Sequence, residues 1–215
     1  MTSSYTQIGN CLIDRTATIC SGAIIGKPFR KLLGGFEEET EITTIGPHAY
    51  IGHFAIIGNG TTIGANTIVD DRCTMESRVS VGKTNLLIYS AQLCNDVTVG
   101  DCCVIGGLVG ERTKIGNRCR IFGSIAHSQH DPLKGWDDES STEPSLTIED
   151  EVFIGFGAIL SGEIVLSRRS YVTSGAIVTK NVPSFHIATG VNDIIHHSKW
   201  TGPLRESEFF KNGHD

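Results

Sequence analysis

The sequence predicts an all-β fold, a left-handed parallel β-helix of hexapeptide repeats that carries extruded loops and ends in a short C-terminal tail or helix. Two observations support this prediction. An aliphatic residue recurs every six positions over a long stretch of the chain. The composition is rich in glycine, with 25 residues in 215, and poor in aromatic residues. A thin, tightly coiled backbone accommodates this composition better than a layered core does.

The period of six is unbroken over the middle of the chain. It fits neither an α-helix, which repeats every ~3.6 residues, nor an alternating strand, so a β-sandwich is disfavoured. Three short strands joined by turns would form one coil, with the aliphatic residues pointing inward and small residues near the corners. The aliphatic positions are Ile45, Ile51, Ile57, Ile63, Val69, Met75, Val81, Leu87, Leu93, Val99 and Ile105.

Shorter pieces of the same period lie on either side of this series. An early piece holds Ile13, Ile19 and Ile25, and a frame shift near residues 106–108 leads to a piece that begins at Val109. Glycine follows many of the aliphatic residues, and we expect it to permit the backbone angles that the corners need. The last piece consists of Ile148, Ile154, Leu160, Leu166, Val172 and Val178.

Two polar, charged segments interrupt the repeat at residues 27–41 and 127–147. Both contain glycine or proline, so we expect loops that are extruded from the corners of the coils. Loops on a rigid scaffold are where binding and catalytic residues concentrate. We expect Pro183 to end the repeat. The predicted organisation is one β-helix domain over residues 1–190 and a cap or tail over residues 191–215.

Charge and composition argue against several classes of protein. The 24 acidic residues outnumber the 18 basic ones, and the net charge of -6 disfavours a general nucleic-acid binder. The sequence has neither an apolar run of membrane-spanning length nor the pattern of a signal peptide, so we expect a cytoplasmic protein. The seven cysteines are odd in number and do not suggest a disulfide framework. Four of them occupy small, buried positions of the repeat: Cys73, Cys94, Cys103 and Cys119.

Three segments carry a resemblance to a known family of enzymes. They are GSIAHSQHDP at residues 123–132, TIEDEVFIGFGAIL at residues 147–160 and VTSGAIVTKNVP at residues 172–183. Together with the repeat over most of residues 8–183, they resemble the hexapeptide-repeat acetyltransferases. This broad family includes galactoside, maltose and xenobiotic O-acetyltransferases and sugar-nucleotide N-acyltransferases.

The resemblance implies the transfer of an acyl group, chiefly acetyl, to a hydroxyl or amino group of a small acceptor. The acceptor would be a sugar, an amino sugar or a sugar nucleotide, and acetyl-CoA or another acyl-CoA would be the co-substrate, with no metal required. The resemblance also implies a homotrimer. Such an assembly would cover the flat faces that a solenoid leaves along its sides.

His127 is the predicted catalytic residue. It lies where the last strand before the long loop is expected to end, which matches the catalytic histidine of the family. Acyl transfer to a hydroxyl or an amine requires a base that works near neutral pH, and imidazole suits this role. The alternative for His127 is a solvated loop histidine. His130, which precedes Asp131, is the second candidate, because the residue that follows His127 departs from the small spacer usual in the family.

The resemblance also assigns groups around the thioester. The backbone N–H of Phe156 is the candidate donor to the oxyanion of the intermediate, although phenylalanine replaces the small residue of the family there. Phe153 falls where the family often has tryptophan against the pantetheine arm. The candidate CoA contacts at the end of the repeat are Ser174, Thr179, Lys180 and Arg168, with Arg169 beside the last of these.

Two alternatives come from other classes of protein. His48 and His53 have a spacing that suggests the γ-class carbonic anhydrases, but they sit one place out of phase in the hexads and a third histidine is missing. A non-catalytic trimeric scaffold is the other alternative, because a fold alone does not imply a function. The acidic residues Asp137, Asp138, Glu139 and Glu143 would suit a cationic acceptor, or they form a solvated face.

Overall fold

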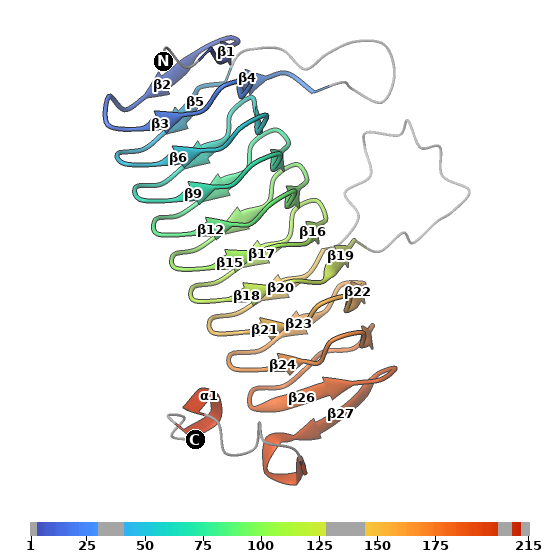
Figure 1. Ribbon diagram of the computed structural model, residues 1–215. Helices are drawn as coiled ribbons and strands as arrows, with labels where there is room; N and C mark the ends of the chain where they lie inside the picture. The colour runs from blue at the N-terminus through green and yellow to red at the C-terminus, as the bar shows by residue number, and fades with distance from the viewer. Residues whose placement is uncertain (1–3, 30–40, 128–144, 202–207, 212–215) are drawn as a thin grey trace, which may run out of the picture.

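Three parallel sheets wind around a common axis as a β-helix (Figure 1). The computed structural model describes residues 4–29, 41–127, 145–201 and 208–211. Up to β25, consecutive strands belong in turn to the three sheets, and strands of neighbouring coils pair in parallel. The structure confirms the predicted β-helix of hexapeptide repeats.

We call the three sheets A, B and C. Sheet A contains β1 (Thr6–Gln7), β4 (Ile24–Lys27), β7 (Ile56–Gly58), β10 (Thr74–Met75), β13 (Gln92–Leu93), β16 (Leu108–Val109), β19 (Ser124–Ala126), β22 (Ile159–Ser161) and β25 (Ile177–Val178). Sheet B contains β2 (Cys11–Ile13), β5 (Thr43–Ile45), β8 (Thr62–Ile63), β11 (Ser80–Val81), β14 (Thr98–Val99), β17 (Lys114–Ile115), β20 (Thr147–Ile148) and β23 (Val165–Leu166). Sheet C contains β3 (Thr18–Ile19), β6 (Tyr50–Ile51), β9 (Ile68–Val69), β12 (Leu86–Leu87), β15 (Val104–Ile105), β18 (Arg120–Ile121), β21 (Phe153–Ile154), β24 (Tyr171–Val172), β26 (His186–Thr189) and β27 (Asp193–His196).

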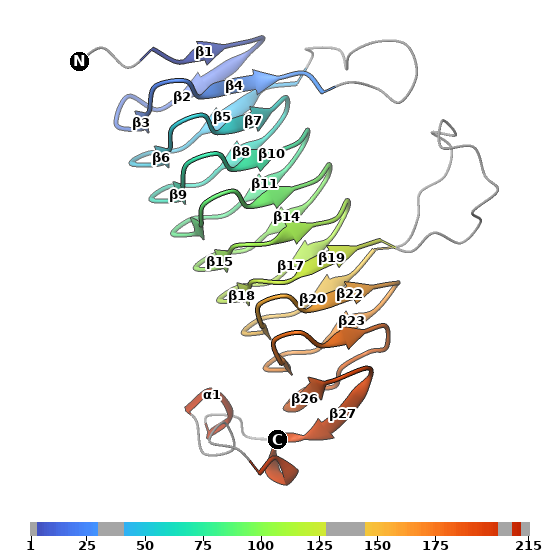
Figure 2. The ribbon, with the colours of Figure 1, turned by 45° about the vertical axis from the view of Figure 1, so that its right-hand side comes forward.

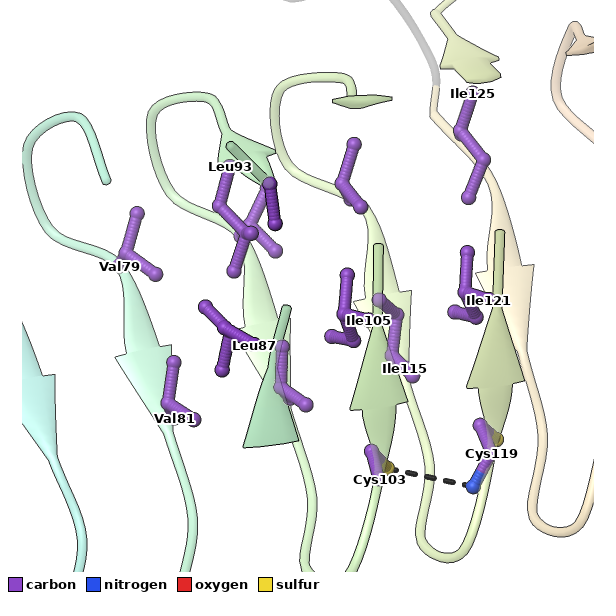
Figure 3. Close-up of a cluster of buried hydrophobic side chains, with 14 of the residues drawn as sticks. Val79, Val81, Leu87, Leu93, Cys103, Ile105, Ile115, Cys119, Ile121 and Ile125 are labelled. Carbon is purple, nitrogen blue, oxygen red and sulfur yellow. Dashed lines mark hydrogen bonds between the residues drawn. The ribbon is translucent and has the colours of Figure 1, made fainter. Parts of the chain in front are cut away.

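The core is a stack of aliphatic side chains inside the coil. Most strands have two residues, of which the first points outward and the second is buried. Val81, Leu87 and Leu93 show this for one coil, since each comes from a different sheet and is at most 1% exposed (Figure 3). Burial stabilises each such side chain by about 1.5–3 kcal/mol. The period of six in the sequence therefore corresponds to the side chains that point into the core.

Two buried cysteines illustrate the small positions between strands. Cys103 and Cys119 lie one coil apart, and the backbone N–H of Cys119 donates to Sγ of Cys103 at 3.4 Å (Figure 3). All seven cysteines of the chain are free thiols. Cys94 is only partly buried, whereas Cys73 is fully buried.

Each coil has three corners, which we name by the sheets that they join. At an A–B corner the chain leaves a strand of sheet A and enters the next strand of sheet B. Both long interruptions of the repeat occur at this corner, because β4 and β19 both belong to sheet A and are followed by β5 and β20 of sheet B (Figure 2). Most residues of the predicted loops 27–41 and 127–147 lie outside the described ranges.

The glycines that follow the aliphatic residues have a different role from the expected one. Gly52 and Gly64 do not adopt positive φ. A Cβ at Gly52 would lie 2.6 Å from the backbone carbon of Asp70, and one at Gly64 would lie 2.5 Å from that of Gly82. Glycine is needed there because adjacent coils approach closely. The positive φ angles of the corners fall mostly on other residues, such as Arg72 and Asp96.

The frame shift near residues 106–108 is a shortened C–A corner. Only residues 106 and 107 connect β15 to β16, and the next coil repeats the same short corner at residues 122 and 123. A Cβ at Gly107 would clash with the carbonyl oxygen of Gly123. The two short corners therefore stack on each other only without a side chain at this point.

Sheet C extends beyond Pro183, where we expected the hexapeptide repeat to end. Strand β26 pairs in parallel with β24, and β27 then pairs antiparallel with β26, so the end of sheet C is closed by a hairpin. The 3-10 helix η1 (His197–Lys199) and the short helix α1 (Glu208–Lys211) follow. Among the described residues, none of the helices is long and apolar enough to cross a membrane.

Candidate functional site

His127 directly follows β19 at an A–B corner and is partly buried. Lys180 lies at the same corner two coils further along, because β19 pairs with β22 and β22 pairs with β25. Two coil spacings of about 4.8 Å separate them by ~10 Å along the axis. Lys180 is exposed to solvent. The rigid A–B corner therefore carries a histidine and an accessible cation on one line.

A carboxylate lies beside His127 along this corner. Glu111 holds the equivalent place one coil earlier, since β16 pairs with β19. Its carboxylate accepts hydrogen bonds from a guanidinium nitrogen of Arg112 at 2.9 Å and from Nδ2 of Asn95 at 3.5 Å. Gly110 leaves room for the close approach, because a Cβ there would lie 3.3 Å from the backbone nitrogen of His127. The surroundings of His127 are thus built from tightly stacked coils.

The thiol at this corner is poorly suited to act as a nucleophile. Burial, together with the nearby carboxylates of Glu76 and Glu111, raises the pKa of Cys94 to about 12. A thiol with such a pKa stays protonated near neutral pH. The imidazole of His127 is therefore the better candidate to accept a proton here.

Thr179 is engaged in holding the corner together. Its backbone N–H donates to Oδ1 of Asn192 at 2.7 Å, and Nδ2 of Asn192 donates back to its hydroxyl oxygen at 2.9 Å. The hydroxyl proton of Thr179 remains able to donate to a ligand. This reciprocal pair fixes the backbone that carries Lys180.

Phe156 and Ser174 lie at a different corner, between sheets C and A. Phe156 is 63% exposed, and its ring stacks on Phe122 with the centroids 4.5 Å apart. Ser174 holds the equivalent place one coil further along, where its backbone nitrogen would lie 2.5 Å from a Cβ at Gly155. The two predicted residues therefore share one corner.

One chain does not bring His127 and Phe156 to the same point. Phe156 precedes β22, whereas His127 follows β19, which is the neighbour of β22 in sheet A. The two residues therefore lie at opposite ends of adjacent strands, with the width of sheet A between them. A single reacting carbonyl cannot contact both within one copy of the chain.

The predicted phosphate ligand Arg168 lies at the third corner, between sheets B and C. Here one carboxylate binds three arginines. Glu151 accepts hydrogen bonds from Arg118 at 2.7 Å, from Arg168 at 3.4 Å and from Arg169. Its side chain is only 17% exposed. Part of the positive charge of Arg168 is therefore neutralised by Glu151.

The arginine cluster leads to a prediction about acid stability. Burial alone would raise the pKa of Glu151, but hydrogen bonds from the arginines outweigh burial and lower the pKa from 4.5 to about 2. A carboxylate with a lowered pKa stabilises the fold above its ordinary pKa, and this contribution is lost as the pH falls through the folded value. We expect the melting temperature of the wild type to exceed that of Glu151→Gln near neutral pH, and the gap to close between pH 4.5 and 2.

Thermal unfolding followed by circular dichroism measures this difference. Glu163→Gln, which removes an exposed carboxylate at another corner, is the control for the loss of one charge. A gap between the wild type and Glu151→Gln that stays constant down to the acid end of the range would contradict the assignment.

Phe153 forms part of an aromatic wall on the outer face of sheet C. Its ring stacks on Tyr171 with the centroids 4.5 Å apart, and Phe122 meets it edge-on at 6.0 Å. Phe209 of α1 meets Tyr171 edge-on at 5.9 Å. A cavity of about 380 Å³ lies between this wall and the arginine cluster, and it is lined by Arg118, Arg120, Glu151, Val152, Phe153, Arg169 and Phe209.

Several predicted residues lie outside the described ranges or away from the corner of His127. His130, Asp131 and the acidic residues of the second loop lie outside the described ranges. His48 lies at a B–C corner and His53 at a C–A corner, where its ring nitrogen is 3.3 Å from Asp71. Among the described residues, no cluster of three or more histidine, cysteine or acidic side chains could hold a metal.

Reasoning from the sequence missed most of the B–C cavity. Arg118 and Glu151 occupy the same place in successive coils, but the second loop places them 33 residues apart in the sequence. Arg120 precedes a core aliphatic residue, which is the outward position of a strand. A scan of these outward positions for charged and aromatic residues would have found Arg120 and Tyr171.

Comparisons with known proteins agree with the fold. The profile of the family described as bacterial transferase hexapeptide (six repeats) matches residues 41–71. The chain is 26% identical over 216 residues to the bifunctional protein GlmU of Koribacter versatilis, covering 92% of this chain and 42% of that protein. It is 28% identical over 131 residues to an acyl-[acyl-carrier-protein]–UDP-N-acetylglucosamine O-acyltransferase of Campylobacter concisus, covering 57% of this chain and 50% of that protein.

Among solved structures, the UDP-N-acetylglucosamine acyltransferase of Campylobacter jejuni resembles the chain with a TM-score of 0.50 at 15% identity. The alignment covers 88% of this chain and 73% of that one. At this identity, the likeness concerns the fold. The chain spans about half the length of the curated relatives that it matches.

Proposed function

We propose that this chain, which belongs to the hexapeptide-repeat transferase family, transfers an acyl group from a CoA thioester to a hydroxyl or amino group of a small, sugar-like acceptor. His127 is the general base in this proposal. Acetyl is the proposed acyl group.

The observation that carries the proposal is the position of His127. It is a partly buried histidine at the point where a long segment leaves a rigid corner of the coil. Lys180 follows on the same line, and a cation suits a phosphate group of CoA. A base and a phosphate ligand at a fixed separation are what a phosphopantetheine thioester requires of its binding site.

The proposed reaction uses few groups of the protein. Acyl-CoA supplies an electrophilic thioester carbonyl when it is bound. His127 accepts the proton of the acceptor hydroxyl or amine as the acceptor oxygen or nitrogen forms a bond to the carbonyl carbon. The carbon–sulfur bond breaks, and the CoA thiolate leaves and takes up the proton that His127 accepted, so that His127 is neutral again. A positioned base of this kind contributes about a hundred- to ten-thousand-fold to the rate.

The separation of His127 and Phe156 favours an active site between copies of the chain. The two residues lie at opposite ends of adjacent strands of sheet A, so the N–H of Phe156 can serve the carbonyl near His127 only if a second copy provides it. In a homotrimer, neighbouring copies meet head-to-tail around the three-fold axis. One surface patch of each copy would therefore contact a different patch of the next copy. A trimer with three equivalent sites is the assembly that we propose.

The outer faces of the sheets indicate which side such contacts would use. The outward residues of sheet C are largely apolar, whereas those of sheet B are largely polar, so sheet B suits solvent and sheet C suits a protein contact. The outward residues of sheet C include Tyr50, Ile68, Leu86 and Val104. Those of sheet B include Thr44, Thr62, Ser80, Thr98 and Lys114.

A pair of lysine substitutions tests this assignment. Ile68→Lys places a charge on the apolar face of sheet C, and we expect it to dissociate the trimer because a buried, unpaired charge is costly. Thr62→Lys is the matched control, since it changes an exposed residue of sheet B one strand earlier and should leave the trimer intact. Sedimentation velocity measures both. Equal effects of the two variants would contradict the proposed interface.

A thiol-release assay tests the activity itself. Acetyl-CoA, with an acyl-carrier-protein thioester as a second donor, is screened against amino-sugar nucleotides, simple glycosides and aminoglycosides. We expect release of the thiol with at least one acceptor. Without thiol release, and with no rise in melting temperature on adding acetyl-CoA, the chain would instead be a scaffold without catalysis.

A further inference from the structure

The cavity at the B–C corner is built from two parallel columns of side chains. Arg118, Glu151 and Arg169 form one column, because each holds the same corner position with positive φ in three successive coils. Arg120, Phe153 and Tyr171 form the second column along the outer face of sheet C, where the backbone register pairs each with the next. We call the space between them, of about 380 Å³, the arginine pocket.

The lining of the arginine pocket is positively charged. Three arginines and one glutamate line it, which leaves a formal charge of +2 (three minus one). Glu151 is shared by Arg118 and Arg169. Arg120 is exposed, and in the described part of the chain no hydrogen bond or ion pair engages its guanidinium. The pocket therefore offers the guanidinium of Arg120 to a ligand, next to Arg118 and Arg169, whose charge is only partly neutralised by Glu151.

An aromatic wall faces these charges. Phe153 stacks on Tyr171 in nearly parallel planes, 7° apart, and Phe209 closes one side of the pocket. The faces of the Phe153 and Tyr171 rings are turned toward each other, so a planar ring of a ligand can pack against their edges, and such aromatic contacts add to the energy of burial. The volume is within the range of small-molecule sites. An anion that also carries a planar ring matches the charge and the wall together.

We propose that the arginine pocket binds a nucleoside diphosphate, with its phosphates on Arg120 and Arg118 and its base on the aromatic wall. This inference rests on the proposed function only for the source of the ligand. Acyl-CoA and a sugar nucleotide both carry a nucleoside diphosphate, and the arms of the experiment separate them. The pocket is at the B–C corner, away from His127 and Lys180 of the same copy.

Isothermal titration of the full chain with ADP, 3′,5′-ADP and UDP tests the proposal. We expect saturable binding of at least one of them, tighter for the adenine ligands if CoA is the source and for UDP if a sugar nucleotide is. Arg120→Gln should weaken this binding about tenfold to a hundredfold, because it removes a charge-assisted hydrogen bond. Lys114→Gln is the matched control, since it removes an exposed cation of the preceding strand on sheet B.

The outcomes separate this inference from the proposed acyl transfer. His127→Ala should bind the nucleotides as the wild type does. Binding that depends on Arg120, in a chain that transfers no acyl group, would support the pocket and contradict the proposed function. Absence of binding at millimolar nucleotide, or an equal loss in Arg120→Gln and Lys114→Gln, would overturn the pocket. If Arg120→Gln changes the sedimentation of the protein and no nucleotide binds to the wild type, the pocket is a contact between copies. This result also overturns the proposal.

Discussion

His127→Ala is expected to lower turnover by at least about a hundredfold, because it removes the base that accepts the proton of the acceptor. The melting temperature, the sedimentation of the trimer and the stabilisation by acetyl-CoA should stay close to those of the wild type. The reason is that His127 follows a strand whose core residue, Ile125, is fully buried and unchanged. Steady-state thiol release with the best acceptor of the screen measures the effect.

Two histidine variants serve as controls for this result. His130→Ala tests the second candidate in the same loop. His53→Ala removes an exposed histidine at a C–A corner many coils away, and we expect it to retain full activity. Full activity of His127→Ala would remove the assignment of the base, and a large loss in His130→Ala alone would transfer it to His130.

Gly107→Ala is expected to cause the largest loss of stability among single methyl additions at the corners. The new Cβ would clash with the carbonyl oxygen of Gly123 on the next coil, and a backbone atom cannot move away as a flexible side chain can. Overpacking of this kind costs about 1–3 kcal/mol and occasionally more. Because each coil is held only by its neighbours, the damage weakens the stack on both sides.

Urea unfolding followed by circular dichroism measures the shift in the midpoint. Gly175→Asn is the control, since a Cβ at this position has no atom within 4 Å, and asparagine tolerates the observed φ of 71°. We expect a small shift for Gly175→Asn and a large one for Gly107→Ala. Similar midpoints for the two variants would show that the short corners relax more easily than their backbone contact implies.

The candidate site could be predicted from the sequence only in part. The sequence predicts His127 because it adjoins an interruption of the period and matches a segment of a family, and its role stays a prediction. The roles of Gly52 and Gly64 were predicted incorrectly, since the close approach of adjacent coils is a property of stacking and leaves no trace in the spacing of residues. The hairpin that extends sheet C beyond Pro183 was not predicted, because its two four-residue strands do not follow the period of six.

The sequence by itself determined the coil. A period of six forces the outward and inward positions of every strand, and the aliphatic residues at that period, such as Leu87 and Ile105, form the buried core. Burial of apolar side chains dominates the free energy of folding, so the spacing of the aliphatic residues in the sequence predicts which side chains form the core.

Only the tertiary structure decided which residues meet. The corner to which a residue belongs depends on how many strands precede it and on whether each insertion returns to the corner that it left. The structure separates His127 from Phe156 by sheet A, and it collects Arg118, Glu151 and Arg169 from three coils at one corner. The physical reason is that the ladder between coils aligns residues by register, whereas a loop of any length can intervene in the sequence.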